Sequence, residues 1–186
     1  DISAPSAVLV DAESGKVLYD KSSDEVRSCA SITKMMTLIL VMEAIESGKL
    51  SLSDKIVASE HASSMGGSDI WLEPGEAMSA DDMIKAVVVA SANDAAVALA
   101  EQISGTEEAF VSEMNQKAKE LGMNNTTFKN CNGLDEDGHV TTAYDISLMA
   151  RELMKHKSIF SYTSIWIDYL RNGKTQLVNT NKLLKS

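Results

Sequence analysis

Three things that the sequence has little of exclude whole classes of protein. Lys and Arg number 17 against 27 Asp and Glu, and the net charge of −10 argues against nucleic-acid partners. No apolar run approaches the roughly 20 residues that cross a bilayer, since the longest lies near Met35–Met42. Two cysteines, Cys29 and Cys131, are too few for a disulfide scaffold and lack metal-ligand spacing. This favours two buried free thiols, with a single bridge left open as the alternative.

The first residues, Asp1–Pro5, contain no basic and then apolar leader. The protein is therefore either cytosolic or has had a signal peptide removed. A length of 186 residues, with 44% hydrophobic and 24% charged, is typical of one globular domain or most of a larger one. It excludes a disordered or fibrous chain. No repeat, low-complexity segment or linker divides the sequence.

The first half of the chain predicts a hairpin followed by a central helix. Apolar segments at Ser6–Asp11 and Lys16–Tyr19, separated by turn residues, predict a β-hairpin. From Ser31 the chain is apolar on nearly every side, without proline, up to a terminating Gly48. Such a pattern predicts a helix buried all round.

The remaining segments predict mainly helices. We expect loops and short helical turns over 50–75, a helix from Ser79 to Ala90, a helix over 95–103 capped by Asn93 or Asp94, an amphipathic helix over 107–122, a loop over 124–139, a helix over 143–156 and an extended, irregular tail over 161–186.

Ser31 and Lys34 are the first candidates for chemistry. Three residues apart at a helix start, their side chains share one face. The unpaired N–H groups there favour a developing oxyanion, and a lysine of lowered pKa can take the serine proton. The alternative is that Ser31 only caps the helix and Lys34 is solvated. Against it, Lys34 would lie in the first turn of a core helix, where an unpaired charge is costly.

Ser91 and Asn93 are the second candidates. They place a hydroxyl and an amide between two apolar helical segments, where the alternative is a simple helix cap. With Ser31 and Lys34 they could converge as nucleophile, base, proton relay and amide clamp. Other catalytic templates fail, because no G-x-S-x-G or H-E-x-x-H pattern occurs and the three histidines are scattered.

These motifs and their surroundings resemble the low-molecular-mass penicillin-binding proteins of the serine D-alanyl-D-alanine carboxypeptidase family. Ser31–Lys34 matches the family's Ser-x-x-Lys and Ser91–Asn93 its Ser-x-Asn. The resemblance covers essentially all 186 residues in family order. It includes the opening hairpin and the segments 71–75, 132–135, 141–145 and 177–181.

One departure from the family is large. The third motif, Lys-Thr-Gly, is absent: Gly173–Thr175 is followed by Gln176, and the chain stops at Ser186, just short of where the motif belongs. In the family that motif supplies a substrate-binding cation and one amide of the oxyanion hole. We therefore expect the 186-residue chain by itself to be inactive.

The resemblance implies a mixed α and β fold, the β-lactamase/transpeptidase-like αβα sandwich. That fold has a five-stranded antiparallel sheet and a helical subdomain, and we expect its C-terminal strands to be missing from this chain. The implied single catalytic domain, 1–186, divides into the hairpin of the sheet at 1–30, a mainly helical part at 31–160, and a return toward the sheet at 161–186.

The implied reaction is acyl transfer without metal or cofactor. Ser31 attacks the carbonyl between the two terminal D-alanines of a peptidoglycan stem peptide, with Lys34 as base. Ser91 passes the proton toward the leaving amine, and Asn93 holds the substrate amide. β-Lactams would acylate the same serine. The resemblance further implies a bacterial, extracytoplasmic protein whose signal peptide has been removed, with any membrane attachment in a segment outside this chain.

Two rival functions remain at this stage. A serine β-lactamase shares both motifs but needs a deacylating glutamate, and the candidates Glu136 and Glu152 do not sit in the Glu-x-x-x-Asn pattern of those enzymes. A non-catalytic peptidoglycan- or partner-binding module is favoured by the missing third motif.

Overall fold

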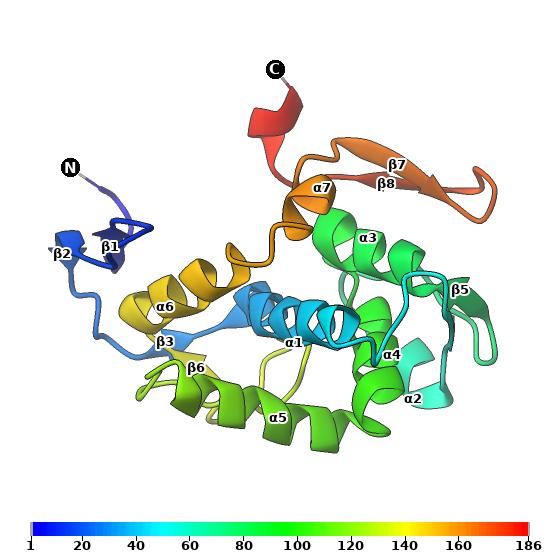
Figure 1. Ribbon diagram of the computed structural model, residues 1–186, viewed down its shortest axis with the longest axis horizontal. Coiled ribbons are helices and arrows are strands. Elements are labelled where there is room, and N and C mark those ends of the chain that lie inside the picture. The colour runs from blue at the N-terminus through cyan, green and yellow to red at the C-terminus, as the bar shows by residue number, and fades with distance from the viewer. Residues whose placement is uncertain (1, 186) are drawn as a thin grey trace.

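The computed structural model describes residues 2–185, which form a helical body with short strand pairs at its margins (Figure 1). The helices are η1 (Ala30–Thr33), α1 (Lys34–Glu46), α2 (Glu60–Ser63), α3 (Ala80–Ala90), α4 (Asn93–Ser104), α5 (Glu107–Glu120), α6 (Ala143–Leu153), α7 (Ile159–Thr163) and η2 (Lys182–Lys185), where η marks a 3-10 helix. Among residues 2–185, each helix is too short or too polar to cross a bilayer.

The strands pair two by two. They are β1 (Ala7–Val10), β2 (Val17–Lys21), β3 (Arg27–Ser28), β4 (Lys55–Val57), β5 (Ala77–Ser79), β6 (Val140–Thr141), β7 (Ile167–Leu170) and β8 (Thr175–Val178). Within the described residues, the antiparallel pairs are β1–β2, β3–β6, β4–β5 and β7–β8. The mixed α and β composition predicted from the sequence is confirmed.

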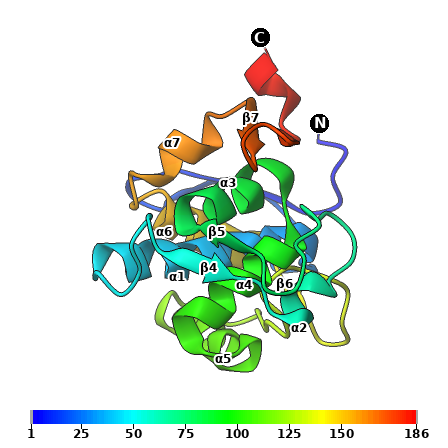
Figure 2. The same cartoon turned by 90° about the vertical axis from the view of Figure 1, so that its right-hand side faces the viewer.

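α1 lies at the centre of the helical body, as its all-round apolar pattern predicts. Nine of its 13 residues are buried, Lys34 among them. Figures 1 and 2 show α5 and the β7–β8 hairpin on opposite sides of α1. Helices α4 and α6 also contact it. The helix ends at Ser47, and Gly48 follows with a φ of +76°, a conformation that glycine adopts without strain.

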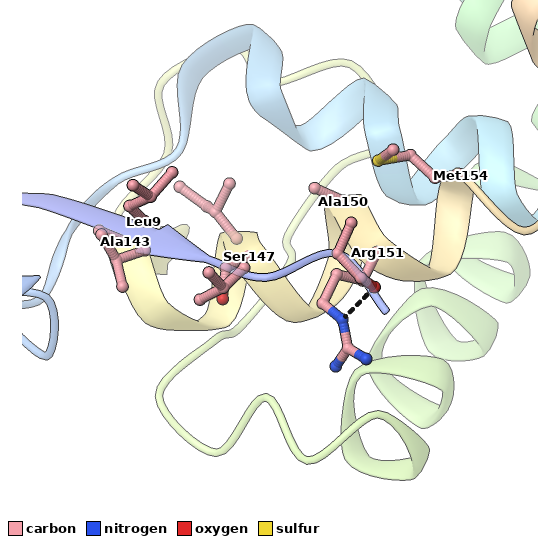
Figure 3. A pocket seen from close by; sticks show the side chains of 10 residues that line it. Leu9, Ala143, Ser147, Ala150, Arg151 and Met154 are labelled. Carbon is pink, nitrogen blue, oxygen red and sulfur yellow. Dashed lines mark hydrogen bonds between the residues drawn. The ribbon is translucent and has the colours of Figure 1, made fainter. Parts of the chain in front are cut away.

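The predicted β1–β2 hairpin is confirmed, with Ala7 opposite Lys21. Its first strand packs on α6, where Figure 3 shows Leu9 beside Ala143 at an apolar groove. Arg151 of α6 fixes the turn of the hairpin, because its Nε donates to the carbonyl of Ala12 at 3.1 Å. The hairpin is therefore attached to the helical body through one face and one arginine.

Three predictions about local structure were wrong. The segment 50–75, expected to hold only loops and short turns, contains β4, which pairs with β5. The three-residue strands are too short to leave a period in the sequence. Neither Asn93 nor Asp94 caps α4, whose N-cap is Ala92 without a side-chain cap. Both side chains make tertiary contacts instead.

The tail over 161–186 is also not irregular within its described part, to 185. It forms the end of α7, the β7–β8 hairpin and η2. An Asn-Gly turn joins the two strands, with φ of +54° at Asn172 and +87° at Gly173. This turn signal in the sequence could have predicted the hairpin. Within residues 2–185 the two strands pair only with each other, and β8 packs on α3. The predicted return of this segment toward a larger sheet stays a prediction. Asp1 and Ser186 lie outside the described residues.

The two cysteines confirm the prediction of buried free thiols, since Cys29 and Cys131 are both free and buried.

Candidate active site

Lys34 is buried at the first residue of α1, with 4% of its surface exposed. Its Nζ donates to Asn93 Oδ1 at 2.7 Å and to the main-chain oxygen of Asn132 at 2.6 Å. Ser31 Oγ lies at 3.4 Å from the same Nζ. All three acceptors are neutral. The interpretation of Lys34 as a solvated side chain is therefore wrong.

Burial lowers the pKa of Lys34 to about 8, because the interior disfavours the charged ammonium. The negative charge of Asp69 opposes this shift. Burial also raises the pKa of the Cys131 thiol well above its usual value, so the thiol is neutral at pH 7 and adds no negative charge. A minor fraction of the Lys34 amines is then neutral at pH 7. The amine therefore lies 3.4 Å from the Ser31 hydroxyl with a lowered pKa, while its role as a base stays a prediction.

Ser31 belongs to η1, the 3-10 turn that leads into α1, and its side chain is exposed. The residue before it, Ala30, has a φ of +46°, a left-handed conformation that costs a non-glycine residue about 1–2 kcal/mol. Such strain persists where the surrounding structure enforces it, often at functional positions. Here the strained residue, Ala30, directly precedes the exposed Ser31, whose hydroxyl lies near the buried Lys34.

The loop 130–134 packs against the backbone of Ala30 and Ser31 and helps to hold it in place. Gly133 has a φ of +92°, and a Cβ at this position would overlap the Ala30 carbonyl and lie 2.9 Å from Ser31 N. Only glycine allows the loop to approach so closely. The loop also holds the Asn132 oxygen on Lys34. One short segment thus supports both the serine backbone and the lysine ammonium.

Two helices fix the same loop through Cys131. Its carbonyl accepts from Thr37 Oγ1 at 2.6 Å, and its N–H donates to Glu107 Oε1 at 3.0 Å. The other oxygen of Glu107 pairs with His61 Nε2 at 2.6 Å. Sequence analysis missed Glu107 and Asn132. Nothing in the sequence separates Glu107 from the exposed Glu108 beside it, because both are acidic residues in a first helical turn.

Ser91 ends α3 in a left-handed conformation, with φ 57° and ψ 35°. It shares a cavity of about 460 Å³ with Ser31 and Lys34. The other lining residues are apolar or threonine, and they come from η1, α1, α3, α6, α7 and the segment after β8: Ile32, Met35, Leu38, Val87, Val88, Leu153, Ile159, Thr163 and Thr180. The structure thus brings three of the four predicted residues to one cavity.

Asn93 lies beside the cavity rather than in its lining. Its Oδ1 accepts from Lys34, and its Nδ2 donates to the Gly66 carbonyl at 2.6 Å. Its main-chain N–H donates to the Ser68 carbonyl at 2.7 Å. Its observed contacts position the lysine. Its predicted hold on a substrate amide stays a prediction.

Asp94, which sequence analysis considered only as a helix cap, organises the loop around Gly66. Its carboxylate is buried and accepts from the N–H groups of Ile70 and Leu72, at 3.2 and 3.0 Å. The loop that holds Asn93 is thereby attached to the start of α4.

Comparison with known proteins places this geometry in a family. The family model described as Peptidase_S11, D-alanyl-D-alanine carboxypeptidase, matches residues 1–186. The chain is 56% identical to the D-alanyl-D-alanine carboxypeptidase DacF of Bacillus subtilis over 185 residues, which are 98% of this chain and 48% of DacF. It spans about half the length of the curated relatives it matches.

Solved structures give the same result. Penicillin-binding protein 5 from Haemophilus influenzae superposes with a TM-score of 0.94 at 32% identity, over all of this chain and 54% of that one. Penicillin-binding protein D2 from Listeria monocytogenes, in its ampicillin-bound form, gives 0.86 at 34% identity, over all of this chain and 75% of that one. The predicted fold and family resemblance are confirmed, and the chain belongs to the D-alanyl-D-alanine carboxypeptidase family Peptidase_S11.

Proposed function

We propose that the protein containing this chain is a serine D-alanyl-D-alanine carboxypeptidase, which removes the terminal D-alanine of peptidoglycan stem peptides and is acylated by β-lactams. One observation carries the proposal: a buried lysine of lowered pKa, held by neutral acceptors, lies 3.4 Å from an exposed serine hydroxyl. Family membership and the ampicillin-bound Listeria relative support it.

In this mechanism the neutral amine of Lys34 takes the proton of Ser31 Oγ as that oxygen bonds to the substrate carbonyl carbon. The C–N bond to the terminal D-alanine then breaks. The proton passes through Ser91 to the leaving amine. Water attacks the resulting ester and releases the shortened peptide, restoring the hydroxyl of Ser31. The N–H of Ser31, whose position Gly133 helps to set, donates to the developing oxyanion.

Asn93 has two roles in this proposal. Its Oδ1 orients Lys34, as its 2.7 Å contact supports. Its Nδ2 carries two hydrogens, of which one is used by Gly66. The second hydrogen is the group that would donate to a substrate carbonyl.

The proposed substrate sets the proposed location. Peptidoglycan stem peptides lie outside the cytoplasmic membrane, so we place the protein in the bacterial cell envelope or outside the cell, with its signal peptide removed. The net charge of −10 is unsuited to a nucleic-acid partner. Any membrane attachment would lie in a segment outside this chain.

Covalent labelling by a fluorescent penicillin tests the proposal, with the protein as its organism produces it. We expect one adduct per chain, mapped to Ser31 by mass spectrometry. Ser31→Ala should lose the label completely, and Ser53→Ala, on a distant exposed turn, should keep it. An adduct on Ser91, or undiminished labelling of Ser31→Ala, would overturn the assignment. No labelling of the unaltered protein would favour the non-catalytic binding module.

The rate of label loss separates the carboxypeptidase from a β-lactamase. The proposal predicts a stable adduct, since neither glutamate considered for deacylation lines the cavity of Ser31. Glu152 pairs with Lys155 at 2.6 Å, and Glu136 accepts from Asn130 Nδ2 at 3.3 Å. Rapid hydrolysis of the adduct would identify a β-lactamase instead.

A further inference from the structure

The opposite end of α1 carries a separate cluster of titratable side chains. Glu43 of α1, Glu152 of α6 and His156, just after α6, each bring one ligand atom within 4.8 Å of the other two. Glu43 follows Lys34 by nine residues, so the cluster lies about 14 Å along the helix axis from the catalytic lysine. The proposed carboxypeptidase mechanism uses none of these side chains.

His156 is the buried member of the cluster, with 7% of its surface exposed. Its Nδ1 lies 2.8 Å from Glu46 Oε1. A carboxylate can only accept, so Nδ1 carries the hydrogen and Nε2 of the neutral ring carries a lone pair. That Nε2 is buried and has no hydrogen-bond partner in the described part of the chain. An unpaired buried nitrogen costs free energy, which a bound ligand would recover.

The charges around the cluster favour a cation. Lys117 pairs with Glu43 at 2.7 Å and with Glu120 at 3.2 Å. Lys155 pairs with Glu152 at 2.6 Å. Together with Glu46, four carboxylates face two ammonium groups, so the group carries −2 when the imidazole is neutral. A divalent cation would balance this charge.

We propose that Glu43, Glu152 and His156 form a binding site for a divalent transition-metal ion of the zinc type. Imidazole nitrogen with carboxylate oxygen is a zinc-type donor set, whereas Ca²⁺ and Mg²⁺ take oxygen donors alone. Glu46 would be the outer partner that fixes the ligating histidine, an arrangement usual in zinc proteins.

The three donors would need to close to bond lengths of about 2.0–2.2 Å from a shared ion. Both glutamates are partly exposed and can rotate toward it, while His156 is fixed by burial and by Glu46. Water would fill the fourth position. The bound ion would join the end of α1 to the end of α6, so its expected effect is on stability.

Calorimetric titration of the purified protein with ZnCl₂ tests the site. We expect one Zn²⁺ per chain and no comparable affinity for Ca²⁺. Glu46→Gln should weaken binding by about 10–100-fold, the usual cost of losing an outer partner. His156→Gln and Glu152→Gln should weaken it further. Co²⁺ bound in place of Zn²⁺ should give a visible spectrum that His156→Gln abolishes.

Matched controls locate the ion. Glu113→Gln removes an exposed carboxylate of α5, and His61→Gln removes the other histidine that pairs with a glutamate. Neither should change the affinity. Zn²⁺ should also raise the melting temperature of the unaltered protein and not that of Glu152→Gln, whose side chain is partly exposed and whose fold should persist.

Three results would overturn the proposal. Undiminished Zn²⁺ binding by Glu152→Gln or His156→Gln would show that other surface carboxylates bind the ion. Equal affinity for Ca²⁺ would reduce the cluster to an acidic patch. Loss of binding in His61→Gln would place the ion at the His61–Glu107 pair. If His156→Gln does not fold, Glu152→Gln and the Co²⁺ spectrum of the unaltered protein decide.

Discussion

Lys34 begins α1 and Lys117 pairs with Glu43 of the same helix, but their ammonium groups have different neighbours. Lys34 is surrounded by a serine hydroxyl, an amide oxygen and a main-chain carbonyl. Lys117 faces the carboxylates of Glu43 and Glu120. Burial acts to lower the pKa of both lysines. At Lys117 the two carboxylates outweigh burial and raise the pKa, whereas at Lys34 burial prevails and the pKa falls to about 8.

The difference shows how the acceptors around a buried lysine decide whether its pKa is lowered or raised. Neutral acceptors hold the amine in place without stabilising its charge, and carboxylates do both. Lys117 therefore remains an ion-pair partner at all physiological pH values, whereas the amine of Lys34 is available as the base that we propose. The following predictions test this comparison.

The largest effect should come from Lys34→Arg. Arginine keeps the charge and cannot release a proton, so acylation by penicillin should fall by about 10²–10⁴. Lys117→Arg, which keeps its ion pairs, should leave the rate unchanged.

In the unaltered protein the acylation rate should rise with pH and level off above about 8, since only the neutral amine accepts the proton. Stopped-flow labelling against pH measures both effects. Near-normal acylation by Lys34→Arg would leave Lys34 a structural role.

The support of Lys34 by the loop 130–134 can be broken with Gly133→Ala. Gly122→Ala is the matched control, because Gly122 also has a positive φ of +77° but open space where a Cβ would be added. Both variants carry the strain of a left-handed alanine, about 1–2 kcal/mol. The clash with Ala30 should add about 1–3 kcal/mol at position 133. Urea unfolding measures the difference.

Penicillin labelling of the same two variants should show slower acylation only for Gly133→Ala, since its alanine displaces the backbone of Ser31. Equal rates in the two variants would show that the close approach of the loop is irrelevant to the site.

A smaller effect should follow Glu107→Ala. This variant tests a carboxylate that supports the Lys34 site without contacting the lysine, in contrast to the carboxylates that pair with Lys117. Glu107 binds the loop through the N–H of Cys131 rather than binding Lys34. Its loss leaves that buried N–H unpaired, at a cost of about 1–3 kcal/mol, and loosens the loop. Glu120→Ala removes a carboxylate from Lys117 and should change neither stability nor acylation appreciably. Thermal unfolding and labelling rates of both variants provide the check. An unchanged acylation rate in Glu107→Ala would refute its positioning role.

The smallest effect should be the pH dependence contributed by His61. The hydrogen bond with Glu107 raises the pKa of His61 above its usual 6.5, although burial opposes the shift. A raised folded-state pKa means that the added stability is fully present below pH 6.5 and is lost as the pH rises through the folded pKa. Because the imidazole is half exposed, the contribution should be below about 1 kcal/mol. The free energy of unfolding, compared across this range for the protein and His61→Gln, should show a larger fall in the unaltered protein.

Local signals predicted a large part of the fold and the relative position of Ser31 and Lys34 in the candidate site. The hairpin, α1, α3, α5 and α6 each follow from a period, a cap or a terminating glycine within their own segment. The spacing of Ser31 and Lys34 placed them on one helical face because that relation is local. Short strands such as β4 left no period, and the β7–β8 hairpin was missed although its Asn-Gly turn was readable.

The sequence by itself determined which residues could carry the chemistry, because Ser-x-x-Lys at the start of an apolar helix sets side-chain identity and relative position together. The tertiary structure alone decided the chemical state of Lys34. Its pKa is lowered by burial, and the partners that hold it there, Asn93 and the Asn132 carbonyl, lie 59 and 98 residues away in the chain. Burial and the partners it brings are properties of packed segments, and no local pattern encodes the electrostatic environment that those segments create.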